Sequence, residues 1–530
     1  MKETRLAALL VTVFVLLAGS AMLRTSPTFD EIVFPAVGAR GLHNGDFSMV
    51  NDHPRLPQYV LGLPLYLSGV HYPPEEGYRW NWWTRYQYSE YLYWAAGNSA
   101  EAVTMSARLV GLAFGAFTVL ATFLLARRHM PAGAALTAAT IVAFMPDILG
   151  HSGVAYNDVP LAFGVLVSVY ALDALVREPS ARRAALAAVA FALTVCMKYS
   201  GLILLPILAV LIALEALARW RDGAWRSALL KAAGVFALVT YLVIVALYVG
   251  DWRLAEYMAG LGELSNSAIT TGRTAFLLGE RRTGGWWYFF PVAFALKTPF
   301  GLHALAAVAA VAAMAASRNG AWRAWASHPA RAPAAGVVLL LVATMASRMN
   351  IGMRHALPLL PLACILVAQG VAWAWQRGAR VLRALIGVCV VALVASTLRA
   401  YPYFLSYLSE YAIGRPLHET LVDSNTDWGQ GLVGLREFMR EKGIDRVSLG
   451  YFGTALPQGY GIKYHPLPSY FQLPGDALPG PLPRYAVVSA TLLAGSYLAE
   501  DPYARLRKEK PVAVVGGSLY VFDLQALKGP

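Results

Sequence analysis

Three acidic residues stand just beyond apolar segments of this chain, where carboxylates could serve as a general base. Asp30 and Glu31 follow the first apolar segment, in the stretch Thr28-Phe29-Asp30-Glu31, and Asp158 opens a later one. A positioned carboxylate can accept the proton of an attacking hydroxyl or amine. Asp158 has a second interpretation as a helix N-cap, because Asp favours that position.

Basic residues also stand at the ends of apolar segments, on the side where we expect the acids. They are Lys198, Lys297, Arg354 and His355. Lys and Arg are common ligands of phosphate groups, and a cation can stabilise a departing phosphate. Lys198 could instead reach the lipid headgroups by snorkelling. Acids and cations together predict a site for a phosphate-bearing substrate and a second, polar substrate.

The composition indicates that these groups lie in a polytopic α-helical membrane protein. The chain has 530 residues, of which 57% are hydrophobic and 14% charged, whereas a soluble domain is about half apolar and a quarter charged. A crossing helix needs roughly 20 apolar residues, and about eleven segments approach that length. The predicted spans are residues 6–23, 104–126, 132–149, 159–176, 184–198, 201–218, 228–249, 287–316, 332–347, 355–375 and 382–399.

The basic loops predict the orientation of the chain. Arg127, Arg177, Arg219 and Arg377 follow the second, fourth, sixth and tenth spans. Because cytoplasmic loops carry the excess of Lys and Arg, the N-terminus is expected in the cytoplasm and the C-terminal region outside. The first span is expected to stay as a signal-anchor. The net charge of +13 then reflects membrane topology and needs no nucleic-acid partner.

We predict two domains. Residues 1–400 form the membrane domain, including a first outer loop over 24–103 that is rich in Trp and Tyr. Its aromatic residues suit an interfacial belt or, alternatively, short helices that wall a site. Residues 401–530 form a small α/β domain. Helical periodicity covers 428–442, and strand-like runs cover 446–452, 485–490 and 511–523.

Motifs for other chemistries are missing from the sequence. No Walker loop, paired zinc-binding histidines or Gly-x-Ser-x-Gly elbow occurs, so nucleotide hydrolysis, metalloproteolysis and serine hydrolysis lack support. We predict no cofactor and no metal site. A divalent ion bound by Asp30, Glu31 or Asp158 stays an open alternative.

Several short stretches resemble bacterial polyprenyl-phosphate-dependent glycosyltransferases of the GT-C fold. This group, glycosyltransferase family 39, includes the protein O-mannosyltransferases and aminoarabinose transferase-like proteins. The matching stretches cover nearly the whole chain in the expected order; they are Asp30-Glu31, Gly45-Asp46-Phe47, His53-Pro54, Lys198-Tyr199-Ser200-Gly201, Lys297-Thr298-Pro299, Arg354-His355-Ala356-Leu357-Pro358 and Asp423-Ser424-Asn425-Thr426-Asp427-Trp428-Gly429-Gln430. The last is the most distinctive.

The resemblance implies roles for individual residues. It makes Asp30 the catalytic base, with Glu31 as its neighbour and Asp158 as a second acidic site residue. Lys198, Lys297, Arg354 and His355 would face the donor phosphate. His53, Asp423 and Asp427 would serve acceptor binding or structure, and Asp427 with Gln430 also fits a capping box for the following helix. Two positions depart from the family pattern: Arg55 replaces a second proline, and His355 replaces a common Tyr.

The resemblance therefore implies a transferase of hexosyl or pentosyl groups, with a polyprenyl-phosphate-linked sugar as donor and a lipid, glycan or protein as acceptor. The Ala- and Arg-rich composition favours a bacterial inner membrane, with the C-terminal domain in the periplasm. A lipid-linked-glycan flippase or transporter and a non-catalytic assembly protein are the alternatives. Convergence of Asp30, Asp158, Lys198 and Arg354 on one cavity beside a lipid groove would favour the transferase.

Overall fold

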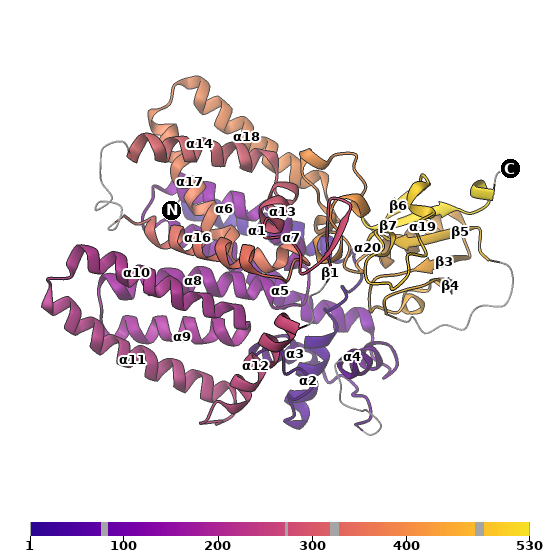
Figure 1. The fold of residues 1–530 in the computed structure, drawn as a ribbon, viewed down its shortest axis with the longest axis horizontal. Coiled ribbons are helices and arrows are strands. Elements are labelled where there is room, and N and C mark those ends of the chain that lie inside the picture. Colours follow the sequence, from indigo (N-terminus) through magenta and orange to yellow (C-terminus); the bar gives the residue numbers. More distant parts are fainter. Residues whose placement is uncertain (1, 76–82, 271–273, 318–327, 472–481, 529–530) are drawn as a thin grey trace.

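The chain folds into a helical bundle with a small β-sheet at one end (Figure 1). We analysed a computed structural model, which describes residues 2–75, 83–270, 274–317, 328–471 and 482–528. The sheet, formed near the C-terminus, lies beside the helices of the first outer loop.

Each predicted span coincides with a helix or with a pair of helices. Seven described helices are long and apolar enough to cross a membrane, or up to nine if each bent pair is one span. The seven are α1 (Lys2–Met22), α5 (Ala100–Ala126), α8 (Asp158–Arg177), η1 (Tyr199–Ile203) continued by α10 (Leu204–Arg219), α11 (Gly223–Leu247), α17 (Leu359–Arg377) and α18 (Arg380–Arg399). The shorter helices α9 (Ala181–Met197) and α16 (Arg331–Ala346) occupy the two remaining predicted spans. The protein is thus a multi-pass membrane protein.

Two predicted spans are bent. Helix α6 (Ala132–Ala143) meets α7 (Pro146–Ser152) at 62°, and α13 (Phe289–Lys297) meets α14 (Phe300–Ser317) at 115°. A proline stands at each break, Pro146 and Pro299. Proline lacks a backbone N–H and disfavours helical geometry in the residue before it, so the helix stops there.

The first outer loop forms three short helices. They are α2 (Val33–Asn44), α3 (Leu56–Ser68) and α4 (Thr84–Trp94). Two glycines allow α2 and α3 to touch: a Cβ on Gly38 would lie 2.0 Å from the carbonyl oxygen of Gln58, and one on Gly62 would lie 2.3 Å from the backbone of Gly38. This arrangement supports the interpretation of the loop as a helical wall.

Helix α12 (Ala255–Thr270) and a hairpin of β1 (Thr274–Leu277) and β2 (Glu280–Thr283) connect the spans α11 and α13. The sequence had not predicted them. The hairpin is joined to the C-terminal part, because the Leu278 N–H donates to the Thr420 carbonyl at 2.9 Å.

The C-terminal sheet has five strands in the order β4-β3-β5-β7-β6. The elements of this region are α19 (Leu432–Lys442), β3 (Arg446–Gly450), β4 (Lys463–Pro466), β5 (Tyr485–Ser489), α20 (Ala490–Leu493), β6 (Ala513–Val515) and β7 (Leu519–Asp523). Strand β3 pairs in parallel with β4 and β5, and β7 pairs antiparallel with β5 and β6. The predicted small α/β unit is therefore present.

Three details of this region differ from the prediction. The predicted run 511–523 is two antiparallel strands, β6 and β7. The helix begins at Leu432 rather than at Trp428, although it ends at Gly443, whose φ of 64° needs glycine. Strand β4 was not predicted, because it is short, lies at the sheet edge and contains Pro466.

Candidate active site

One cavity of about 430 Å³ combines a charged end with an apolar end. Its polar lining includes Asp30, Asp52, His53, Arg85, Tyr86, Tyr156, Lys198, Arg354 and His355. Apolar side chains from α8, η1, α12 and α16 complete it, among them Leu161, Val165, Ile203, Leu261, Leu264 and Leu340. Such a cavity can hold a molecule with one charged and one hydrocarbon part.

Asp30 lies between a hydroxyl donor and a cation. The Tyr86 hydroxyl donates to its Oδ1 at 2.9 Å, and Arg354 Nη2 lies 3.1 Å from its Oδ2. The Asp30 side chain is still 20% exposed, so a substrate can reach it. The Asp30 carboxylate thus contacts α4 through Tyr86 and the segment before α17 through Arg354.

Asp158 is not among the residues that line the cavity, but it contacts two residues that do. Its Oδ1 accepts a hydrogen bond from Lys198 Nζ at 2.6 Å, and its Oδ2 lies 3.9 Å from Arg354 Nη1. Helix α8 begins at Asp158 itself, after Asn157 at the cap position. Its carboxylate therefore serves to hold the two cations at the cavity, which the N-cap interpretation did not foresee.

Arg354 is surrounded by acids and aromatic rings. It lies in the short helix η2 (Met353–Ala356), with its Cζ 4.2 Å from the Trp428 ring centroid and 5.3 Å from that of Tyr156. Burial opposes its charge, but Asp30, Tyr156 and Asp158 raise the pKa of Arg354 above its ordinary value. The guanidinium therefore stays charged and can bind an anion in the cavity.

Besides Asp158, two further predicted site residues, Glu31 and Lys297, lie outside the cavity lining. Glu31 is buried and bound by Arg108, with Nε–Oε1 at 2.6 Å and Nη2–Oε2 at 3.0 Å. Lys297 is buried too; its Nζ donates to the carbonyls of Leu405, Tyr407 and Asn425 and lies 3.3 Å from Asp147 Oδ1. Both contacts join distant parts of the chain.

Asp423 and Asp427 also lie outside the cavity lining, whereas His53 is part of it. Asp423 accepts a hydrogen bond from the Tyr497 hydroxyl. Asp427 accepts from the Thr491 N–H at 2.7 Å and from Ser518 Oγ at 2.8 Å. Because α19 begins at Leu432, after Gly431, Asp427 does not cap that helix.

The buried position of Asp427 predicts a dependence of stability on pH. Burial raises the pKa of its carboxyl from 3.8 to about 6. The folded chain then holds this proton more tightly than the unfolded chain, so the contribution is complete below about pH 4 and is lost as the pH rises through about 6. The Asp427→Asn variant should gain about 3 kcal/mol relative to wild type between pH 4 and pH 7. Thermal unfolding of both proteins across this range would check it, and parallel pH profiles would contradict it.

The sequence interpretation did not assign Asp52, Arg85, Tyr86 or Tyr156 to the site, although all four line the cavity. Arg85 binds both carboxylate oxygens of Asp52, at 2.6 and 3.1 Å, while the next residue, Tyr86, binds Asp30. Burial opposes ionisation of Asp52, but His53 and Arg85 lower the pKa of its carboxyl below the ordinary value. The aromatic-rich composition of this loop was the signal for α4, but composition alone could not single out these residues.

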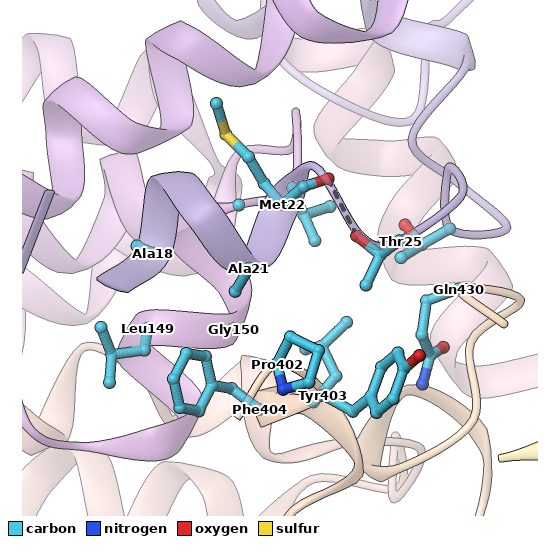
Figure 2. Close-up of a pocket in the computed structure, with 14 residues that line it drawn as sticks. Ala18, Ala21, Met22, Thr25, Leu149, Gly150, Pro402, Tyr403, Phe404 and Gln430 are labelled. Carbon is cyan, nitrogen blue, oxygen red and sulfur yellow. Dashed lines mark hydrogen bonds between the residues drawn. The ribbon is translucent and has the colours of Figure 1, made fainter. Parts of the chain in front are cut away.

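A second, smaller cavity of about 20 Å³ lies between the end of α1, helix α7 and the loop around Pro402 (Figure 2). Figure 2 shows Gln430 and Tyr403 on one side of it and Met22 and Thr25 on another. This volume suits about one water molecule. Within the described part of the chain, no group of three or more His, Cys, Asp or Glu side chains is arranged to hold a metal ion.

Comparison with known proteins extends the resemblance. Residues 7–254 match the family model described as dolichyl-phosphate-mannose-protein mannosyltransferase. This range includes Asp30, Asp52, Asp158 and Lys198, and it ends before Arg354. A comparison with curated proteins gave no match.

Solved structures that are similar to this chain include an oligosaccharyltransferase and a protein named ArnT. Archaeal oligosaccharyltransferase AglB from Archaeoglobus fulgidus, in complex with an inhibitory peptide and a dolichol-phosphate, has a TM-score of 0.53 and 11% identity, covering 99% of this chain and 75% of that one. The Archaeoglobus fulgidus oligosaccharyltransferase in the apo form has a TM-score of 0.51 and 11% identity, covering 93% and 72%. ArnT from Cupriavidus metallidurans bound to undecaprenyl phosphate has a TM-score of 0.48 and 14% identity, covering 99% of each chain. The resemblance to polyprenyl-phosphate-dependent glycosyltransferases is thus confirmed by a family model over residues 7–254, and the chain has the GT-C fold.

Proposed function

We propose that this protein transfers a sugar from a polyprenyl phosphate to a hydroxyl or amine acceptor. The observation that carries the proposal is the cavity that Asp30, Lys198 and Arg354 line together with apolar side chains. The family match over residues 7–254 supports a polyprenyl-phosphate donor.

The reaction is a displacement at the anomeric carbon. The acceptor oxygen or nitrogen forms a bond to this carbon, and its proton passes to a carboxylate oxygen of Asp30. The bond from the anomeric carbon to the phosphate oxygen breaks, and the polyprenyl phosphate leaves with the electron pair. Lys198 and Arg354 stabilise the negative charge on that phosphate. Attack opposite the leaving group inverts the configuration of the sugar.

The apolar end of the cavity would hold the first isoprene units. Each methylene group that is buried contributes about 0.8 kcal/mol to the binding of a lipid chain. Contact with the first isoprene units would therefore increase the affinity for the donor. Asp52, ionised and fixed by Arg85, is suited to accept hydrogen bonds from hydroxyl groups of the sugar or acceptor.

Transfer is proposed to occur at the outer face of a bacterial inner membrane. Helix α8 begins at Asp158 in the site and ends at Arg177, one of the basic residues that predict the cytoplasmic side. The candidate active site then lies at the opposite, periplasmic end, together with the C-terminal sheet. This place at the ends of the spans supports transfer over transport, because transporters bind substrate near the midplane.

The direct test is incubation of the purified protein with a panel of undecaprenyl-phosphate-linked hexoses and pentoses and with lipid, glycan and peptide acceptors. Undecaprenyl-phosphate-mannose with a peptide is the first pair to test, because of the family match. We expect one donor to yield a glycosylated product, detected by mass spectrometry. Donors that are bound and moved across vesicle membranes without any product would instead support a flippase.

A further inference from the structure

Residues 423–430 of the C-terminal part lie directly behind the candidate active site. None of them is among the residues that line the 430 Å³ cavity. Trp428 is only 2% exposed, and Asp427 is fully buried. This segment does not line the cavity, yet it contacts the chain segment that carries Asp30 and the one that carries Arg354.

The first contact is with the segment that carries Asp30. The N–H of Phe29, the residue before Asp30, donates to the Trp428 carbonyl at 2.7 Å. Three residues further back, the N–H of Ser26 donates to the Gln430 carbonyl at 3.0 Å and its hydroxyl to the Gly429 carbonyl at 2.9 Å. The backbone of residues 428–430 therefore fixes where the chain enters the site.

The second contact is with the segment that carries Arg354. The Met353 N–H donates to Asn425 Oδ1 at 3.0 Å, and the Ser424 hydroxyl donates to the Ile351 carbonyl at 2.9 Å. Beyond these bonds, the Trp428 ring faces the guanidinium, with Arg354 Cζ 4.2 Å from the ring centroid. Trp428 thus touches the Asp30 segment through its backbone and Arg354 through its side chain.

The packing leaves little room for adjustment. A Cβ on Gly352 would lie 2.2 Å from the Ser424 hydroxyl oxygen. Gly429 has a φ of 92°, and a Cβ there would lie 2.9 Å from Gly453 Cα. Gln430 extends the contact to the end of α1, where it lies at the small cavity near Thr25 (Figure 2). Through these contacts, segment 423–430 holds the segment that carries Asp30 at a fixed distance from the segment that carries Arg354.

We propose that Trp428 is a positioning residue, which holds the Arg354 guanidinium in register with Asp30 so that it can receive the donor phosphate. A desolvated cation over a tryptophan face is attracted by the negative charge density of the ring. The ring contacts the face of the guanidinium, so the N–H groups at its edge can still pair with Asp30 and reach an anion in the cavity. This inference rests on the proposed function, because it assigns the phosphate to Arg354.

The test replaces Trp428 by fluorinated tryptophans of nearly the same shape. One fluorine, then two, then four on the benzene ring withdraw electron density from the face and weaken the attraction for Arg354 in steps. The affinity of the purified full-length protein for undecaprenyl phosphate should fall in the same order, reaching about 3- to 30-fold with tetrafluorotryptophan. A purely structural role would give no graded effect, because the ring still fills the same space.

Trp373 provides a matched control, because its ring lies 4.5 Å from Arg377 Cζ in α17, away from the cavity. Fluorination of Trp373 should leave the affinity unchanged. An affinity independent of fluorination at Trp428, or an equal fall at Trp373, would overturn the inference.

The Arg354→Ala variant tests the phosphate-binding role of Arg354 separately from the positioning role of Trp428. If Arg354→Ala loses affinity for undecaprenyl phosphate and the Trp428 series is flat, the positioning role alone is wrong. If Arg354→Ala binds as tightly as wild type, Arg354 is not the phosphate ligand, and both the positioning role and this part of the proposed mechanism are wrong.

Discussion

The Asp30→Asn variant is expected to transfer sugar ~10²–10⁴-fold more slowly than wild type, because it loses the positioned general base. Asparagine keeps the size of the side chain and can still accept a hydrogen bond from Tyr86, whose hydroxyl lies 2.9 Å from Asp30 Oδ1. The measurement is the initial transfer rate at saturating donor, with whichever undecaprenyl-phosphate sugar the panel identifies.

Two further variants make this prediction specific. Tyr86→Phe removes only the hydrogen bond to Asp30 and should lower the rate far less than Asp30→Asn. Asp46→Asn changes another acid of the same outer loop, whose side chain is 43% exposed and paired with Arg40 outside the cavity; its rate should match wild type. Normal transfer by Asp30→Asn would sink the assignment of Asp30 as the base.

The Arg108→Gln variant is expected to lose about 3–5 kcal/mol of unfolding free energy, because it leaves the Glu31 carboxylate buried without its cation. Arg108 and Glu31 are 0% and 1% exposed and form a two-pronged ion pair. Glu31 also accepts hydrogen bonds from the backbone N–H groups of Thr28 and Ala155, so the pair fastens the Asp30 segment to the start of α8. Denaturant titration in mixed micelles would measure the loss.

The double variant Glu31→Gln/Arg108→Gln should recover part of this loss, since no uncompensated charge remains. Arg177→Gln is a matched control: it removes an ion pair with Asp173, but Asp173 keeps Arg331 at 2.7 Å, so a much smaller loss is expected. A folded double variant that transfers sugar normally would establish a structural role for Glu31. If the double variant is as stable as wild type but does not transfer sugar, Glu31 takes part in catalysis.

The helical spans were predictable because each is encoded locally. A run of apolar residues, a basic loop or a proline acts through its immediate neighbours, so segments such as 159–176 or 228–249 could be located within a few residues. The bends at Pro146 and Pro299 are local in the same sense, because each follows from the proline at the break. The hairpin of β1 and β2 was not, because four-residue strands carry too little periodicity and depend on partners such as Thr420.

The site was predictable as a set of residue types but not as an arrangement. Asp30, Lys198 and Arg354 stood out as charges at helix ends, and they line one cavity. Lys297 stood out on the same grounds, yet its ammonium is occupied by three backbone carbonyls. In the sequence, a lysine that binds substrate and a lysine that binds buried carbonyl groups look the same. Each is a charged residue at the end of an apolar segment, and each needs a polar or acidic partner there.

The sequence by itself determined the class of the protein: a chain of apolar spans with acids and cations at their ends and a small α/β region after residue 400. Only the tertiary structure decided which charges face a substrate. It directs Asp30 into the cavity and the adjacent Glu31 into the core, and it brings Trp428 against Arg354 from the far end of the chain. The physical reason is that hydrophobic patterning acts over one or two helical turns, whereas the partner of a buried charge is chosen by packing between segments distant in sequence.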